Sequence, residues 1–417
     1  MKDTVHRPFE DVSVLDAAIA DATGDFRTDF DRVITWCFEN HRTAKDPRAE
    51  MRMPPESYGL MQEGAKDPSL ADLKAHAKTM ISHGGSAWQW LYDNLADEDS
   101  KKLLLTLLAY RSLGWKYVPM PLDTPAFWKA LGELNARAAA SPKGTQIDTG
   151  FLNLVLSPFD LKPDGHDMNI FADGFGVFSE IFYSQYNYRG AGMTIMPKPG
   201  DVVFDCGSCF GATSLFLADQ VGEEGRIFSF EFLPDNVDVF QKNMSKNPEL
   251  ARRVTLTKSP VWSDDGVNMA VHGSGPATYV SLMHQPLSKK RSKFSRWLKK
   301  FRRRIKSSLG MKVRPPIPEP SLVVSAVSVD AERARRSLDR LDFIKMDIEG
   351  AELAALQGAE QSIRAYRPTL AICVYHKLPD FYEIPQYIDG LGLGYKFYLQ
   401  HSTVHGDETV LFASARD

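Results

Sequence analysis

Fifteen residues at positions 201–215, D-V-V-F-D-C-G-S-C-F-G-A-T-S-L, restrict the fold of this chain more than any other stretch. Positions 202–204 form the short apolar run that is typical of a parallel strand buried on both faces. Gly207 and Gly211 follow and allow a sharp turn at which a ligand can approach the backbone. Apolar residues at helical spacing come next. The stretch therefore predicts a buried strand, a glycine turn and a helix.

A second strand at 226–230 ends in an acid, Glu231, and completes the pattern of a nucleotide-cofactor half-site. Asp205, two residues before the first glycine, would repel the pyrophosphate of a dinucleotide but suits a ligand that is positively charged near the turn. S-adenosylmethionine carries a sulfonium and an ammonium group, and Glu231 could accept hydrogen bonds from its ribose hydroxyls. We therefore expect S-adenosylmethionine rather than NAD. The alternative is a glycine turn that only packs the strand against the helix.

Further residues are expected to contact the same cofactor. Val261 and Trp262 follow the third strand, where an adenine ring usually rests in this architecture, and they offer apolar surface for it. Gln185 and Tyr186 precede the cofactor strand and form either a lid over the methionine end of the ligand or an aromatic packing layer. The full set of predicted cofactor-binding residues is Gln185, Tyr186, Asp205, Gly207, Ser208, Gly211, Thr213, Glu231, Phe232, Val261, Trp262 and Asp347.

The whole chain predicts an α/β fold with a helical addition. Strands and helices alternate from residue 200, and the last two strands, at 395–399 and 408–413, form a closing β-pair. This is the plan of a Rossmann-like class I methyltransferase with a seven-stranded sheet. We expect a mainly helical N-terminal domain at 1–149, a small β and aromatic cap at 150–199, and the methyltransferase domain at 200–417.

A basic segment at 273–320 interrupts this last domain. No acid occurs from Gly273 to Pro318, and lysines and arginines are concentrated at 289–306. Apolar residues within that stretch fall on one helix face, so it predicts a basic amphipathic helix. Such a helix would bind an anionic membrane surface or a phosphate-bearing carrier. A solvated insertion without a role in chemistry is the alternative, and nucleic acid is not the partner that we expect.

The composition indicates where in the cell the protein is expected. A net charge of −3 and 43% apolar residues are ordinary for a soluble globular protein. The four cysteines have no zinc-site or disulfide spacing, and we interpret Cys206 and Cys209 as small turn residues rather than a redox pair. A polar N-terminus and the lack of a long apolar run predict neither a signal peptide nor a membrane span. We expect a cytoplasmic protein, peripheral to the inner face of the membrane if the basic segment binds there.

Three motifs resemble one known family. They are G-D-V-V-F-D-C-G at 200–207, F-I-K-M-D-I-E-G-A-E at 343–352 and R-P-T-L-A-I-C-V-Y-H-K at 367–377. Together they resemble the FkbM-type S-adenosylmethionine-dependent O-methyltransferases over about residues 180–413. The resemblance implies methyl transfer to a hydroxyl group, on a sugar of a surface glycan, a lipid-linked saccharide or a natural product. The chain departs from the family pattern at Cys209 and in its long basic insertion.

Polar residues at the ends of the fourth and fifth strands are the candidates for catalysis, because ligands bind at the carboxyl ends of the strands in such sheets. Asp347 and Glu349 follow the fourth strand, Lys345 lies inside it, and a helix is expected from there to about residue 363. His376 follows the fifth strand. We predict His376 or Asp347 as the general base. Structural roles, with His376 capping a strand end and Lys345, Glu349 and Glu352 forming an ion-pair network, remain as alternatives.

We assign no metal site from the sequence, although Asp347 and His376 together could hold a divalent cation that lowers the pKa of the acceptor hydroxyl. Two other classes of protein stay open. One is an inactive methyltransferase-fold scaffold at a membrane. The other is a nucleic-acid methyltransferase, although the Asn/Asp-Pro-Pro-Tyr/Phe loop that base methylation often uses is absent after the fourth strand. The pattern predicts neither the acceptor molecule nor the oligomeric state.

Overall fold

The computed structural model describes residues 16–19, 22–43, 48, 51, 68–151, 154–190, 193–272, 278–282 and 322–415. Most of the basic segment predicted at 273–320, including its stretch 289–306, lies outside the described residues. No helix in the described part of the chain is both long enough and apolar enough to cross a membrane.

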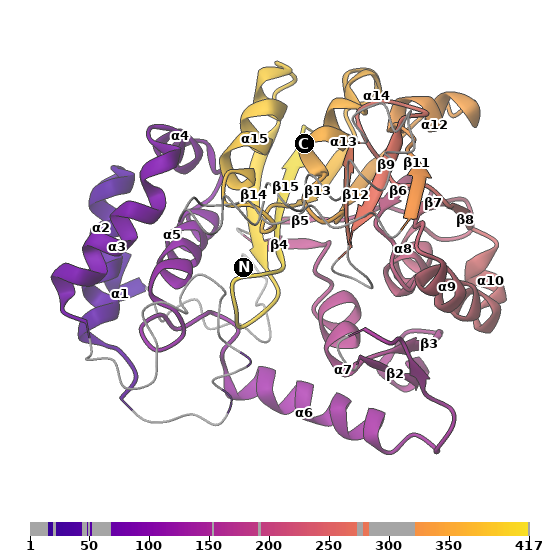
Figure 1. The fold of residues 1–417 in the computed structure, drawn as a ribbon, viewed down its shortest axis with the longest axis horizontal. Coiled ribbons are helices and arrows are strands. Elements are labelled where there is room, and N and C mark those ends of the chain that lie inside the picture. Colours follow the sequence, from indigo (N-terminus) through magenta and orange to yellow (C-terminus); the bar gives the residue numbers. More distant parts are fainter. Residues whose placement is uncertain are drawn as a thin grey trace, which may run out of the picture.

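A seven-stranded sheet forms the centre of the molecule, in the order β14-β15-β13-β12-β6-β7-β8 (Figure 1). The strands β8, β7, β6, β12 and β13 run parallel, and β15 lies antiparallel between β13 and β14. This arrangement confirms the predicted Rossmann-like sheet and its closing β-pair. The strand bounds are β6 Val202–Cys206, β7 Arg226–Phe230, β8 Val254–Thr257, β12 Phe343–Met346, β13 Thr369–Cys373, β14 Lys396–His401 and β15 Thr409–Ser414.

Helices cover both faces of this sheet because its central strands, β6, β12 and β13, are buried along their whole length. These helices are α8 Ala212–Val221, α9 Pro234–Lys246, α10 Pro248–Ala251, α12 Val329–Arg335, α13 Glu352–Gln357, α14 Glu360–Tyr366 and α15 Asp380–Gly390. The single helix predicted from 348 to 363 is divided into α13 and α14. A Cβ atom at Gly358 would lie 2.3 Å from the carbonyl oxygen of Trp262, so the break coincides with a close backbone contact from the loop after β8.

The strand that follows the basic segment belongs to a different sheet. β11 Leu322–Ser325 pairs with β9 Asn268–His272, which also pairs with β10 Tyr279–Leu282. This small antiparallel sheet lies beside the central one, and it flanks the basic segment on both sides in the sequence.

The N-terminal part of the chain is helical, as its pattern predicted. Its elements are α1 Asp16–Ile19, α2 Phe26–Glu39, α3 Leu70–Ile81, η4 Ser82–Gly84, α4 Ala87–Asn94, α5 Glu98–Leu113 and α6 Pro125–Ala139. Side chains of α2 to α5 share one hydrophobic core with α15 and one face of the central sheet. α6 instead packs with α8 and the cap segment on the opposite face.

The chain between α4 and α5 covers the exposed edge of β14 (Figure 1). Leu95 forms a parallel bridge with Phe397, and the Ala96 N–H donates to the Phe397 carbonyl over 2.8 Å. The Leu399 N–H donates to Ser100 Oγ over 2.9 Å, in a fully buried position. Unpaired backbone groups on an edge strand would otherwise invite pairing with other chains, so the helical segment completes the sheet.

The cap segment consists of β1 Ile147–Asp148, β2 Val155–Asp160, η5 Lys162–Asp164, β3 Asn169–Ala172, α7 Gly174–Gly176, the π-helix η6 Val177–Phe182, β4 Tyr188–Gly190 and β5 Met193–Ile195. Asn243 of α9 and Asn247, which caps the end of that helix, fix β3. Asn247 accepts from the Asn169 N–H and donates to its carbonyl, and Asn243 does the same with Phe171. These four bonds anchor β3 to α9, just before the segment that continues into η6.

We expect Ser100→Ala to lower the free energy of unfolding by about 1–3 kcal/mol, because it removes the acceptor of a buried backbone N–H. Ser112→Ala is the matched control. Ser112 lies in the same helix and is equally buried, but its hydroxyl donates within the helix to the Leu108 carbonyl. Urea denaturation of both variants measures the difference. Equal losses of unfolding free energy in the two variants would show that the hydrogen bond from Leu399 to Ser100 does not stabilise the fold.

Candidate active site

A cavity opens at the carboxyl ends of the parallel strands, where the loops after β6, β7, β8, β12 and β13 meet the cap segment. Its empty space, including the open mouth, is about 1280 Å³. Six carboxylate side chains line it, whereas Lys345 is the one basic side chain in its wall among the described residues. The carboxylates are Asp173, Glu180, Glu231, Asp347, Glu349 and Glu408. The cavity is therefore strongly acidic and favours a cationic ligand.

The glycine turn after β6 forms the floor of this cavity. Gly207 has φ +82°, and a Cβ atom at this position would lie 1.8 Å from the carbonyl oxygen of Asp347. Gly211 also has φ +82°, and a Cβ atom there would lie 2.6 Å from the Phe240 ring. The predicted turn is present, and its glycines permit two loops to approach more closely than any other residue would allow. Ser208 and Thr213, also predicted to bind the cofactor, line the cavity beside it.

Asp205 lies beneath the cavity and does not form part of its wall, which differs from the expected contact with the ligand. Its carboxylate is fully buried, accepts a hydrogen bond of 2.6 Å from Ser214 Oγ and pairs with Lys345 Nζ at 3.2 Å. Lys345 Nζ also donates to the Gly207 carbonyl over 2.6 Å. Burial disfavours the charged amine, but Asp205 and Asp347 raise the pKa of Lys345 well above its usual value. Any influence of Asp205 on a ligand is transmitted through this lysine.

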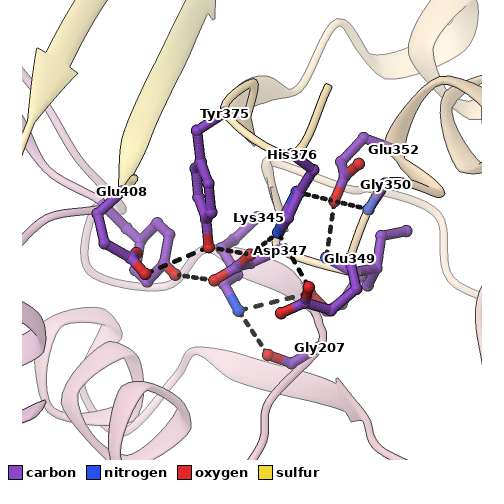
Figure 2. A network of polar contacts seen from close by, with 12 residues as sticks. Gly207, Lys345, Asp347, Glu349, Gly350, Glu352, Tyr375, His376 and Glu408 are labelled. Carbon is purple, nitrogen blue, oxygen red and sulfur yellow. Dashed lines mark hydrogen bonds and ion pairs between the residues drawn. The ribbon is translucent and has the colours of Figure 1, made fainter. Parts of the chain in front are cut away.

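Asp347 lies at the centre of the polar network in Figure 2. Tyr186 donates to Asp347 Oδ2 over 2.9 Å, and the Tyr375 hydroxyl lies 3.2 Å from both Asp347 Oδ1 and Glu408 Oε1. Burial opposes ionisation of Asp347, but the positive charges of Lys345 and His376 lower its pKa. Burial, with the neighbouring charge of Asp347, raises the pKa of Glu408 to about 8. Asp347 is thus held as a carboxylate in the wall of the cavity.

His376 lies behind Asp347 rather than in the cavity wall. Its Nε2 atom is 3.5 Å from Asp347 and 3.6 Å from Glu349, and its Nδ1 atom is 3.1 Å from Glu352. Burial disfavours the imidazolium, but Glu349 and Glu352 raise the pKa of His376 to about 11. Asp347, Glu352 and His376 together are the group of described residues that could hold a metal ion.

Glu231 and Val261 form the other end of the cavity. Glu231 Oε1 accepts from the N–H groups of Phe232 and Leu233 at 2.6 and 2.8 Å, which fixes the carboxylate at the end of β7. Burial raises the pKa of Glu231. Val261 and Phe232 line the cavity as predicted, whereas Trp262 does not. The backbone of Trp262 is turned toward β11, because its N–H donates to the Val327 carbonyl.

Gln185 and Tyr186 both line the cavity and are almost fully buried. The Gln185 side chain accepts a hydrogen bond of 2.9 Å from Ser402, and Lys345 Nζ lies 4.8 Å from the centre of the Tyr186 ring. Both residues therefore belong to a packed layer that also lines the cavity, and their role as a lid over the methionine end of the ligand stays a prediction.

Glu180 is a cavity residue that the sequence pattern did not reveal. It projects from the π-helix η6 and accepts a hydrogen bond of 2.6 Å from Thr213 Oγ1. Burial raises the pKa of Glu180 to about 7. Single-turn π-helical insertions occur frequently at functional sites, but no local sequence signal predicts where they form. Asp173, Tyr375 and Glu408 also line the cavity and were not predicted from the sequence.

Residues 205–397, from the end of β6 to the second residue of β14, match the family model of the methyltransferase FkbM domain. The chain contains an FkbM methyltransferase domain. This match confirms the resemblance seen in the three motifs and the expectation of S-adenosylmethionine as the cofactor. A search of curated proteins finds no match to this sequence.

Several solved structures are similar to the chain that carries this FkbM domain. The methyltransferase FkbM from Methylobacillus flagellatus KT is 18% identical over 82% of this chain, with a TM-score of 0.45, and the chain spans 61% of that protein's length. Fibrillarin from Aeropyrum pernix, solved with natively bound S-adenosyl-L-methionine, is 12% identical over 62% of this chain and 93% of its own, with a TM-score of 0.29. A SAM-dependent methyltransferase from Aquifex aeolicus is 12% identical over 52% of this chain and 81% of its own, with a TM-score of 0.25.

The cavity of the FkbM domain fits this cofactor by its chemistry. A sulfonium and an ammonium group are matched by a wall with six carboxylates and one lysine that is already paired with Asp205. The apolar surface of Val261 and the carboxylate of Glu231 lie together at one end, as an adenosine requires.

We expect the stability contribution of Glu180 to be lost as the pH rises through about 7. Its pKa in the folded protein lies above the usual 4.5, so between these values the folded state holds a proton that the unfolded state has released. The wild-type protein should therefore lose stability, on the order of 2 kcal/mol, from pH 5 to pH 8 relative to Glu180→Gln. The unfolding free energies of the wild type and of Glu180→Gln across this range show whether stability falls as the pH rises. Glu224→Gln is the control, because Glu224 is exposed. Parallel pH profiles for all three proteins would contradict the assignment.

Proposed function

We propose that the protein transfers a methyl group from S-adenosylmethionine to a hydroxyl group of an acceptor, most simply a sugar of a surface glycan, a lipid-linked saccharide or a natural product. One observation carries this proposal. The acidic cavity of the FkbM domain ends at Asp347, a carboxylate whose low pKa keeps it ready to accept a hydrogen bond from a neutral hydroxyl.

Different residues of the cavity bind different parts of the cofactor in this proposal. When bound, S-adenosylmethionine supplies an electrophilic methyl group. Glu231 accepts hydrogen bonds from the ribose, Val261 covers the adenine, and Glu180 pairs with the ammonium group. Glu180 is ionised only partly near neutral pH in the free protein, so a cationic group beside it would promote its ionisation. Cofactor binding should then release a proton.

The acceptor contacts the opposite end of the cavity in this proposal. Asp347 orients the acceptor hydroxyl, and Tyr186 and Tyr375 hold the two carboxylate oxygens of Asp347 in place. Of the two general bases predicted from the sequence, Asp347 faces the cavity, whereas His376 lies behind it. Glu349 lines the cavity next to Asp347, and Lys345 carries the positive charge that keeps Asp347 ionised. Orientation of a bound hydroxyl can supply a large part of the rate enhancement.

The acceptor that we propose carries an anionic group or lies at an anionic membrane. Val280 of β10 and Thr278 just before it line the cavity, and the basic stretch 289–306 follows Val280 within ten residues of the sequence. Lysines and arginines attached so closely to the cavity would attract a phosphate-bearing carrier or a membrane with acidic lipids. Lipid-linked saccharides combine a sugar hydroxyl with such a phosphate.

We expect Asp347→Asn to lower the rate of methyl transfer by roughly 100-fold or more, while the affinity for S-adenosylmethionine changes by less than about threefold. Asp339→Asn is the control, because Asp339 is exposed and precedes β12 at the end opposite to Asp347. Calorimetric titration measures the affinity, and transfer of labelled methyl groups to a panel of lipid-linked and free saccharides measures turnover.

Three results would contradict the proposal. Equal losses of affinity and turnover in the Asp347 variant would place Asp347 at the cofactor rather than at the acceptor. Tight cofactor binding together with products methylated only on nitrogen or carbon would exclude the hydroxyl acceptor. Cofactor binding without turnover on any acceptor would favour the scaffold alternative.

A further inference from the structure

Three side chains from separate elements meet at and behind the cavity wall formed by Asp347, and Figure 2 shows them close together. Asp347 follows β12, Glu352 begins α13 and His376 follows β13. One possible ligand atom of each lies within 4.8 Å of the other two. Ligand atoms bound at about 2.2 Å to one ion lie at most about 4.4 Å apart. A contraction of a few tenths of an ångström would therefore bring all three onto a common ion.

Two of these side chains are buried without complete hydrogen bonding. The His376 side chain is only 8% exposed, and within the described part of the chain neither ring nitrogen makes a hydrogen bond of normal geometry. Glu352 is fully buried, and its Oε2 atom has no partner there either. The N–H groups of Ile348 and Gly350 hold its other oxygen, Oε1. Buried polar atoms of this kind require a partner, and an ion would provide one.

The charge around His376 is unbalanced as well. The carboxylates of Asp347, Glu349 and Glu352 each lie within 3.6 Å of the imidazole ring. Nearby, Oδ2 of Asp380 is buried and has no partner among the described residues. Lys345 supplies one further positive charge, but it also pairs with Asp205. Lys377 supplies another, which lowers the pKa of Asp380. Three positive charges therefore face five carboxyl groups, and a divalent cation in place of the imidazole proton would add a fourth.

We propose that Asp347, Glu352 and His376 bind one divalent metal ion of the class that accepts mixed carboxylate and imidazole ligands, such as Mn²⁺ or Zn²⁺. Carboxylates alone would favour Mg²⁺ or Ca²⁺, and the imidazole shifts the preference toward these transition metals. Asp347 and His376 are far apart in the sequence, and Glu352 becomes the third ligand only through the turn that brings the start of α13 back to β13.

The ion would activate the acceptor hydroxyl, and this role rests on the proposed hydroxyl methylation. Asp347 both lines the cavity and belongs to the cluster, so the ion borders the position of the acceptor hydroxyl. A divalent cation there lowers the pKa of a coordinated hydroxyl. The neighbouring Glu349, which also lines the cavity, is free of the cluster and can accept the proton that this hydroxyl releases.

The test measures Mn²⁺ binding to the full chain after treatment with a chelator and removal of any affinity tag, without cofactor or acceptor. Electron paramagnetic resonance of free Mn²⁺ gives the stoichiometry and the dissociation constant. We expect one site per chain, weakened at least tenfold in His376→Gln and in Glu352→Gln. His405→Gln is the matched control, because His405 also pairs with an acid, Asp407 at 3.7 Å, but does not belong to the cluster.

A pulsed spectrum of Mn²⁺ bound to the wild-type protein keeps the proposal testable if the variants fail to fold. Nitrogen coupling from one imidazole would support it, and a bound ion without such coupling would overturn it. No binding of Mn²⁺ or Zn²⁺ at 1 mM (roughly the weakest affinity of a dedicated site), or binding unchanged in both variants, would also overturn it. Since no methyl transfer is measured, Mn²⁺ binding by an inactive protein would leave the site standing and reject only the proposed function.

Discussion

The buried amine of Lys345 is the interaction on which the rest of this site depends. Its side chain is 2% exposed and contacts Asp205, the Gly207 carbonyl and the Tyr186 ring. These partners belong to β6, to the glycine turn and to the cap segment, so one charge connects the sheet, the floor and the wall of the cavity. Removing one partner of a buried ion pair costs roughly 3–5 kcal/mol, because the other charge is left without compensation. The acidic cavity can exist only because this cation is fixed inside its wall.

The second constraint is the excess of negative charge in the cavity, because it favours cationic ligands. Glu180, Glu231 and Asp347 each face the same cavity from a different element, at a considerable cost in desolvation. Such an arrangement persists when a cationic ligand balances it. The FkbM domain assignment supplies a cofactor with two positive groups, and the cluster behind Asp347 offers a place for one further cation. Either cationic ligand would offset the repulsion between these carboxylates.

The functional groups lie on loops and on the cap, whereas the sheet provides a rigid base. β14 would be an open edge without the chain at 95–100, and β3 is anchored by Asn243 of α9 and by Asn247 at the end of that helix. These contacts join segments separated by 70 to 300 residues. The helical N-terminal part and the cap therefore contribute to the site by fixing its supports, even where they supply no ligand.

The sequence by itself determined the central sheet, the glycine turn, the acid at the end of β7 and the candidate residues after β12 and β13, because each depends on a local pattern. Apolar runs predict buried strands, and the ends of parallel strands meet at one edge. Only the tertiary structure decided that Asp205 pairs with Lys345 beneath the cavity, that Trp262 does not line the cavity, and that Glu180 does. Whether a charged side chain faces a ligand or a buried partner depends on contacts between distant segments of the chain. The residue type alone does not predict these contacts.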